Sequence, residues 1–167
     1  MSPFERTLLA AQGYFELEML DDAIRQLDGL PFEEQFCAEA LEIRIAVQMK
    51  AARWKEALGA SEKLCAVLPE RSIGFIHTAF CLHELGRTRE AKEVLLEGPP
   101  SLASEPTYHY NLACYECALG NLESARAYLA TSVSMDEDLR AYALEDPDLK
   151  LLHKDQKADE TGGGGHA

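Results

Sequence analysis

The chain has 167 residues, of which 16 are Lys or Arg and 29 are Asp or Glu, so its formal net charge is −13. Apolar residues make up 47% and charged residues 27%, a composition typical of a folded globular protein. The acidic excess argues against nucleic acid and anionic membranes as partners, because both require a basic surface.

The cellular location follows from segments and cysteines. No apolar run reaches the roughly eighteen residues that a membrane span requires. The start of the chain, Met1 to Arg6, lacks a basic segment followed by an apolar stretch, so we expect no secretory signal. Five cysteines, an odd number, then favour reduced thiols and a cytoplasmic protein.

The first predicted helix begins at Pro3. Ser2 precedes this proline as the capping residue, and Glu5 stands where a glutamate completes a capping box. The N-terminus is therefore expected to need no additional element.

An internal period of 34 residues governs the next part of the chain. It is marked by four alanines in exact register, Ala23, Ala57, Ala91 and Ala125. The period defines four blocks, 4–37, 38–71, 72–105 and 106–139. Each block is predicted to hold two helices around a short turn, with Gly86 and Gly120 ending the first helix of the last two blocks. Small residues, at the alanine positions and at the eighth place of each block, let the helices cross closely.

These residues resemble the tetratricopeptide-repeat (TPR) family over about 136 residues, four blocks of 34. The last block matches best, through Tyr110 to Tyr115 and Gly120 to Ala125, while the second contributes Trp54 and a closing Pro69. The resemblance implies an all-α, right-handed α-solenoid of about four helix-turn-helix repeats. Prolines come early at Pro31 and at Pro99-Pro100, which predicts short second helices in the first and third blocks.

The segment after the repeats is predicted to be a capping helix over 140–152, split near Pro147. Its apolar side chains are expected to cover the last block: Leu139, Tyr142, Leu144, Leu149 and Leu152. A solenoid requires such a cap. We expect residues 1–152 to form a single domain and residues 153–167, which end in a glycine run, to form a flexible polar tail.

The resemblance also implies a concave groove that is lined by the first helix of each repeat. Carried over position by position, the groove would be formed by Leu8, Gln12, Phe15, Met49, Ile73, Ile76, Phe80, His83, Tyr110 and Cys114. Its apolar middle suits a peptide or an amphipathic helix of another protein. The acidic surroundings favour a partner that is basic as well as apolar. The predicted function is thus a protein–protein interaction scaffold or adaptor, not an enzyme, with no cofactor.

Other interpretations remain open from the sequence. Small acidic TPR proteins also act as secretion chaperones that hold apolar client segments. A metal-dependent or enzymatic role would rest on Cys114, Cys117 and His83, two thiols and an imidazole that lack an obvious fourth ligand. Small side chains on a packed helix are the simpler interpretation of the two cysteines. Uncovered helix faces leave self-association open as well.

Overall fold

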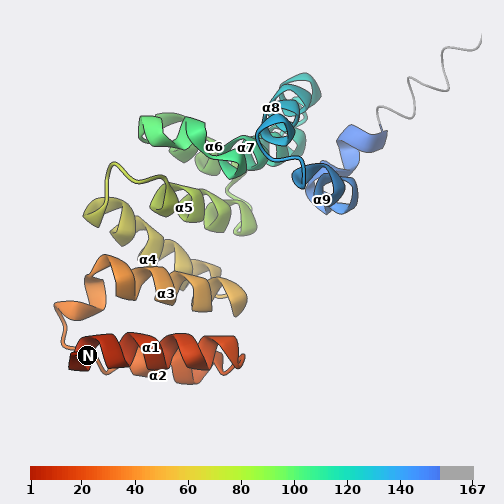
Figure 1. The fold of residues 1–167 in the computed structure, drawn as a ribbon. Coiled ribbons are helices and arrows are strands. Elements are labelled where there is room, and N and C mark those ends of the chain that lie inside the picture. The colour runs from red at the N-terminus through yellow and green to blue at the C-terminus, as the bar shows by residue number, and fades with distance from the viewer. Residues whose placement is uncertain (155–167) are drawn as a thin grey trace, which may run out of the picture. The chain divides into compact units, whose positions relative to one another are not determined.

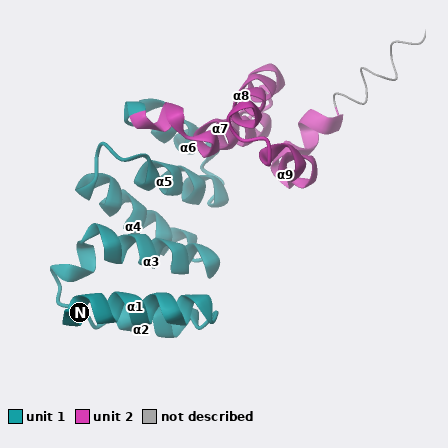
Figure 2. Cartoon of the chain, viewed as in Figure 1, with its two compact units in different colours: residues 1–100 teal, residues 101–167 magenta. Residues whose placement is uncertain are grey.

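The structure, a computed structural model, describes residues 1–154 of the chain (Figure 1). By its contacts the chain divides into two compact units, residues 1–100 and 101–167 (Figure 2). The expectation of one domain over 1–152 stays a prediction. Most of the predicted tail lies outside the described residues, but His153 and Lys154 are helical.

Three helix pairs build the first unit. The pairs are α1 (Pro3–Glu16) with α2 (Leu20–Asp28), α3 (Ala38–Lys50) with α4 (Trp54–Val67), and α5 (Ser72–Glu84) with α6 (Thr88–Glu97). A single 3-10 turn, η1 (Glu34–Phe36), lies between the first two pairs. Each pair falls within one predicted block of 34 residues, so the all-α repeat architecture is confirmed.

The N-terminal helix begins as the sequence predicts. The Glu5 backbone N–H donates to Ser2 Oγ over 3.1 Å, and the Ser2 N–H donates to Glu5 Oε2 over 2.7 Å. This reciprocal capping box satisfies two backbone donors that a helix start otherwise leaves unpaired.

The turn inside each pair repeats one backbone geometry. Gly86 and Gly120 have φ of 76° and 84°, as predicted, and Glu18 and Ala52 adopt the same left-handed conformation at φ of 59° and 53°. In the turn at Gly86, the Arg87 N–H donates to the Leu82 carbonyl over 2.8 Å, which closes the end of α5. The turn geometry is therefore kept even where the side chain makes it costly.

The core follows the small residues of the repeat. The alanines that mark the period are all fully buried, and so are the residues at the eighth place of each block: Ala11, Ile45, Ala79 and Ala113. Leu27 and Leu95 fill the space between helices one turn further on, and both are buried. Ser61, which takes the place of a leucine, donates to the Leu58 carbonyl over 2.9 Å and accepts from Thr78 Oγ1 over 3.0 Å.

The closest helix crossing in the first unit depends on Gly74. A Cβ atom at this position would stand 2.9 Å from the backbone nitrogen of Cys65 and 3.0 Å from its sulfur. Any side chain at residue 74 would therefore push α5 away from α4.

The early prolines shorten the second helices as predicted. The α2 and α6 helices have 9 and 10 residues, whereas α4 has 14. In the first block the chain continues through η1, and after α6 it continues through a second 3-10 turn, η2 (Pro100–Ser104).

The second unit holds one helix pair and the C-terminal cap. The pair is α7 (Pro106–Ala118) with α8 (Leu122–Met135), and the cap consists of α9 (Leu139–Glu145), η3 (Pro147–Leu149) and a last helical segment that is described to Lys154. The split near Pro147 is confirmed, and Leu149 and Leu152 are buried. The prediction that Tyr142 and Leu144 cover the last block is wrong, because 64% and 70% of these residues is exposed.

Candidate functional site

The predicted groove residues of the first unit lie at matching places on α1, α3 and α5 (Figure 1). We call them the first-helix face and define it by eight residues: Leu8, Gln12, Phe15, Met49, Ile73, Ile76, Phe80 and His83. Gln12 is exposed, Ile76 is buried, and the other six are half-buried. The face therefore combines contact with the core and access to solvent.

The part of the face on α1 is anchored in the core of the first repeat. Leu8 packs against a cluster of buried side chains, among them Ala11, Leu27 and Ala40. Gln12 lies one turn further along the helix, and its amide donates to Glu16 Oε1 over 3.3 Å.

Met49 of α3 and Ile73 of α5 share a second cluster. Both side chains pack against buried residues of α3 and α4, which are Leu41, Ile45, Ala60 and Leu64. Because this cluster holds one side of each side chain, the half that reaches solvent is held in place without a partner. Apolar side chains that are fixed in this way can contact a ligand with little loss of conformational entropy.

Two side chains near the end of α5 are held by specific contacts. The ring of Phe80 packs edge-on against Trp54 at the start of α4, with ring centroids 5.9 Å apart. The Nδ1 atom of His83 lies 2.9 Å from Thr88 Oγ1, at the start of α6. Both contacts connect the first helix of the third repeat to a second helix, which fixes the orientation of the aromatic side chains.

Carboxylates surround the first-helix face. At the remaining positions that the family alignment assigns to the groove, five glutamates are exposed: Glu5, Glu16, Glu39, Glu42 and Glu84. Lys50, the one cation at those positions, lies 3.2 Å from Glu18 in an ion pair. Five negative charges against one positive charge give these positions a net charge of −4, which favours a basic partner.

Tyr110 and Cys114, the predicted groove residues of the second unit, are buried. The Tyr110 hydroxyl donates to Asp146 Oδ2 over 2.6 Å, and the Cys114 sulfur lies 3.9 Å from the same oxygen. The ring of Tyr142 stands 5.7 Å from that of Tyr110. The cap therefore covers this part of α7, and these two residues offer no free surface.

The same burial bears on the metal hypothesis. Burial, followed by the charge of Asp146, raises the pKa of the Cys114 thiol well above its usual range, so the thiolate that a metal requires is disfavoured. Cys117 is fully buried, and His83 belongs to the other unit. Among residues 1–154 no group of three or more His, Cys, Asp or Glu side chains is arranged to hold a metal ion.

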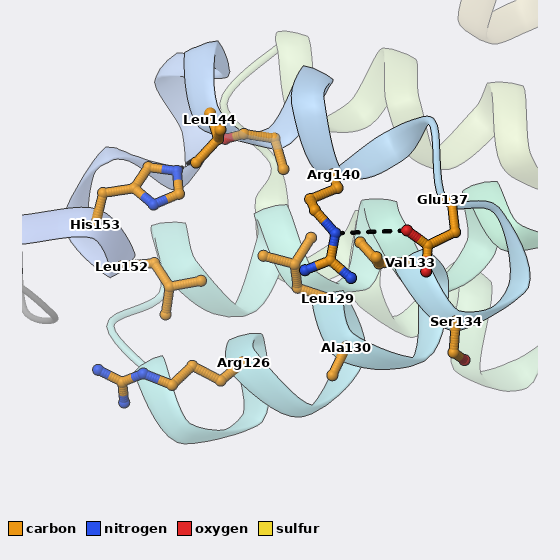
Figure 3. A pocket seen from close by; sticks show the side chains of 11 residues that line it. Arg126, Leu129, Ala130, Val133, Ser134, Glu137, Arg140, Leu144, Leu152 and His153 are labelled. Carbon is orange, nitrogen blue, oxygen red and sulfur yellow. Dashed lines mark hydrogen bonds and ion pairs between the residues drawn. The ribbon is translucent and has the colours of Figure 1, made fainter.

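A pocket that the sequence analysis missed lies in the second unit (Figure 3). It has a volume of about 480 Å³ and is formed by α8, α9 and the last helical segment. Its walls carry apolar side chains such as Leu129 and Val133, together with Arg126, Arg140 and His153. Pro147, which ends α9 early, was the available signal, but the sequence did not show which side chains the short helix would leave uncovered.

No helix within residues 1–154 combines the length and apolar character needed to cross a bilayer. The sequence matches no protein-family profile and no curated protein.

Similar solved structures show which fold this arrangement has. PilF of Pseudomonas aeruginosa is 20% identical with a TM-score of 0.72, and covers 98% of this chain and 78% of its own. A double mutant of MamA is 14% identical with a TM-score of 0.71, at 82% and 77% coverage. YrrB, described as a TPR protein with an unusual peptide-binding site, is 18% identical with a TM-score of 0.62, at 86% and 80% coverage. The chain thus has the TPR fold.

Proposed function

We propose that this TPR protein is an interaction scaffold whose first-helix face binds a basic, amphipathic segment of another protein. The observation that carries the proposal is the combination of half-buried apolar side chains on three successive first helices with a surplus of exposed carboxylates around them. Neither feature is needed for the fold, since the core is formed by the alanine and leucine positions of the repeat.

The chemistry of the face selects the kind of segment. Phe15, Met49 and Phe80 offer large and polarisable apolar surfaces, which suit the nonpolar side of a helix or alternate side chains of an extended peptide. Lys and Arg on the flanks of such a segment would meet Glu39, Glu42 and Glu84. Each exposed pair contributes on the order of 0.2–1 kcal/mol, and together they orient the ligand and speed its approach.

The likeness to YrrB supports binding of a peptide by a TPR structure of this type, because that protein is described as having a peptide-binding site. The identity of the segment is left to experiment.

Site-specific photo-crosslinking in native lysate tests the proposal. A photoreactive phenylalanine analogue replaces Gln12 or Met49 on the first-helix face, and in the control it replaces Glu93, which is exposed on α6. We expect one partner to crosslink at both face positions and not at the control position. Sequencing of the crosslinked peptide should identify a segment with apolar residues at helical spacing and flanking Lys or Arg.

The crosslinked peptide also separates the scaffold from the secretion-chaperone alternative. A scaffold should capture the same folded partner at both positions, whereas a chaperone should capture apolar segments of clients that are unfolded when released. Equal crosslinking at residue 93 and at the face positions would contradict both roles for this face.

A further inference from the structure

The pocket of the second unit exists because the cap is shorter than a repeat. The α9 helix begins at residue 139, where a fifth block would place its first helix, yet it has 7 residues compared with 13 in α3, α5 and α7. The helix ends at Glu145 because Pro147 follows closely and disfavours helical backbone before it. The missing six residues correspond to about 9 Å of helix.

The chain does not fill that space after α9. Asp146 accepts a hydrogen bond from Tyr110, and η3 packs against α7, so the backbone turns away from α8. In the first unit, by contrast, α4 packs along α5, the full-length first helix of the next repeat. The part of α8 that a full helix would cover instead forms the floor of the pocket, with Leu129, Ala130 and Val133 exposed to it (Figure 3).

The charge at the pocket is opposite to that of the chain. Among its lining residues, Arg126 and Arg140 carry positive charge and Glu137 carries negative charge, which gives a formal charge of 2 − 1 = +1 with His153 neutral. The whole chain has a net charge of −13. Arg140 Nε lies 3.6 Å from Glu137 Oε2, and both side chains are largely exposed, so this exposed pair is weak.

We propose that this pocket is a second docking site, which takes a short amphipathic helix with acidic flanks from a partner protein. The partner helix would pack its apolar side on Leu129, Val133 and Leu152, in the space that the missing turns of α9 leave open. Its carboxylates would meet Arg126 and Arg140, which stand on α8 and α9 respectively. About two helical turns fill the space, since six residues of helix span about 9 Å.

This site is distinct from the first-helix face in its place and in the charge of its ligand. The face lies on the first unit and selects basic segments, whereas the pocket lies on the second unit and selects acidic ones. A scaffold with two such sites could hold two different partners through one chain. The pocket proposal does not depend on the face.

Three fluorescein-labelled, hydrocarbon-stapled helical peptides provide the probe. They share one leucine stripe and differ only in the flanking residues, which are Glu, Gln or Lys; the staple compensates for the low helicity of short peptides. Fluorescence anisotropy is measured with the full chain. We expect the Glu peptide to bind about tenfold more tightly than the Lys peptide, a difference of about 1.4 kcal/mol.

Two variants locate the binding site. Ala130→Trp fills the pocket from an exposed position, and its matched control, Ala127→Trp, places the same side chain at an exposed position of α8 that does not line the pocket. Arg140→Glu reverses one charge of the pocket, and Arg89→Glu makes the same change on α6 of the other unit. We expect the pocket variants to weaken binding of the Glu peptide at least about tenfold and the controls to leave it unchanged.

Other outcomes would overturn the proposal. These are failure of the Glu peptide to bind, tighter binding of the Lys peptide at the pocket, or equal effects of the two tryptophan variants. A dimer of the wild-type chain that Ala130→Trp converts to a monomer would show a second copy in the pocket, which also overturns it. Binding of the Lys peptide that responds to changes at Glu39 and Glu42 but not at Ala130 would report on the first-helix face alone.

Discussion

Replacing Gly74 with alanine tests the close packing of α5 on α4. The added Cβ would lie 2.9 Å from the Cys65 backbone nitrogen, whereas ordinary contacts begin near 3.4 Å, so the two helices must separate by about 0.5 Å or more. The atom in the way belongs to helical backbone and cannot rotate aside. Overpacking of this kind costs about 1–3 kcal/mol.

Helix propensity acts in the opposite direction and needs its own control. Alanine is favoured over glycine inside a helix by about 1 kcal/mol. Gly59 lies inside α4, and a Cβ there would meet no atom within 4 Å, so Gly59→Ala gains the propensity without the clash. The difference between the two variants therefore isolates the packing cost.

Urea denaturation followed by the fluorescence of Trp54, the single tryptophan, measures this difference in the helix pair concerned. We expect Gly59→Ala to unfold at a higher urea concentration than the wild type. The free energy of unfolding of Gly74→Ala should lie about 1–3 kcal/mol below that of Gly59→Ala. Equal stability of the two variants would refute the close crossing at Gly74.

Three further predictions concern the cap, a turn and a histidine. Tyr110→Phe removes the hydroxyl that donates to Asp146, and should cost about 1 kcal/mol and speed amide hydrogen exchange in 139–152 while leaving exchange in α1 unchanged. Gly86→Ala should cost about 1 kcal/mol in thermal or urea denaturation because φ is 76°; no loss would show that the turn relaxes freely. Burial lowers the pKa of His77 below 6.5 in the folded chain, so its stabilising effect is complete above pH 6.5 and is lost as the pH falls toward the folded pKa. The wild type should therefore lose more stability than His77→Gln between about pH 8 and pH 5, and parallel curves would contradict this.

The repeats could be predicted from the sequence because each turn and each crossing recurs. Ala57 and Ala91 mark positions where helices approach closely, and Gly86 marks a left-handed turn; both requirements are local and leave a residue type behind. Glu18 and Ala52 show the limit of that logic, since the tertiary structure imposes the same turn on residues that do not favour it.

The cap and the pocket could not be predicted in the same way. The cap occurs once, so no second copy of its pattern fixes which side of α9 faces α8, and Tyr142 and Leu144 were placed on the wrong side. The hydrogen bond from Tyr110 to Asp146 joins residues 36 positions apart that share no motif. Apolar residues such as Met49 also fit two roles from sequence alone, because a core contact and a ligand contact require the same side chain.

The most direct test of the account is the affinity of the crosslinked partner segment for two charge-reversed variants, measured by titration calorimetry. One variant changes Glu39, Glu42 and Glu84 to lysine around the first-helix face, and the other changes Glu56, Glu93 and Glu97, which are exposed on the second helices. Both shift the net charge from −13 to −7, because each of the three changes adds two positive charges. The account predicts that the first variant binds at least about tenfold more weakly while the second binds within about twofold of the wild type at physiological salt. Equal affinities of the two variants would show that the partner does not bind the first-helix face.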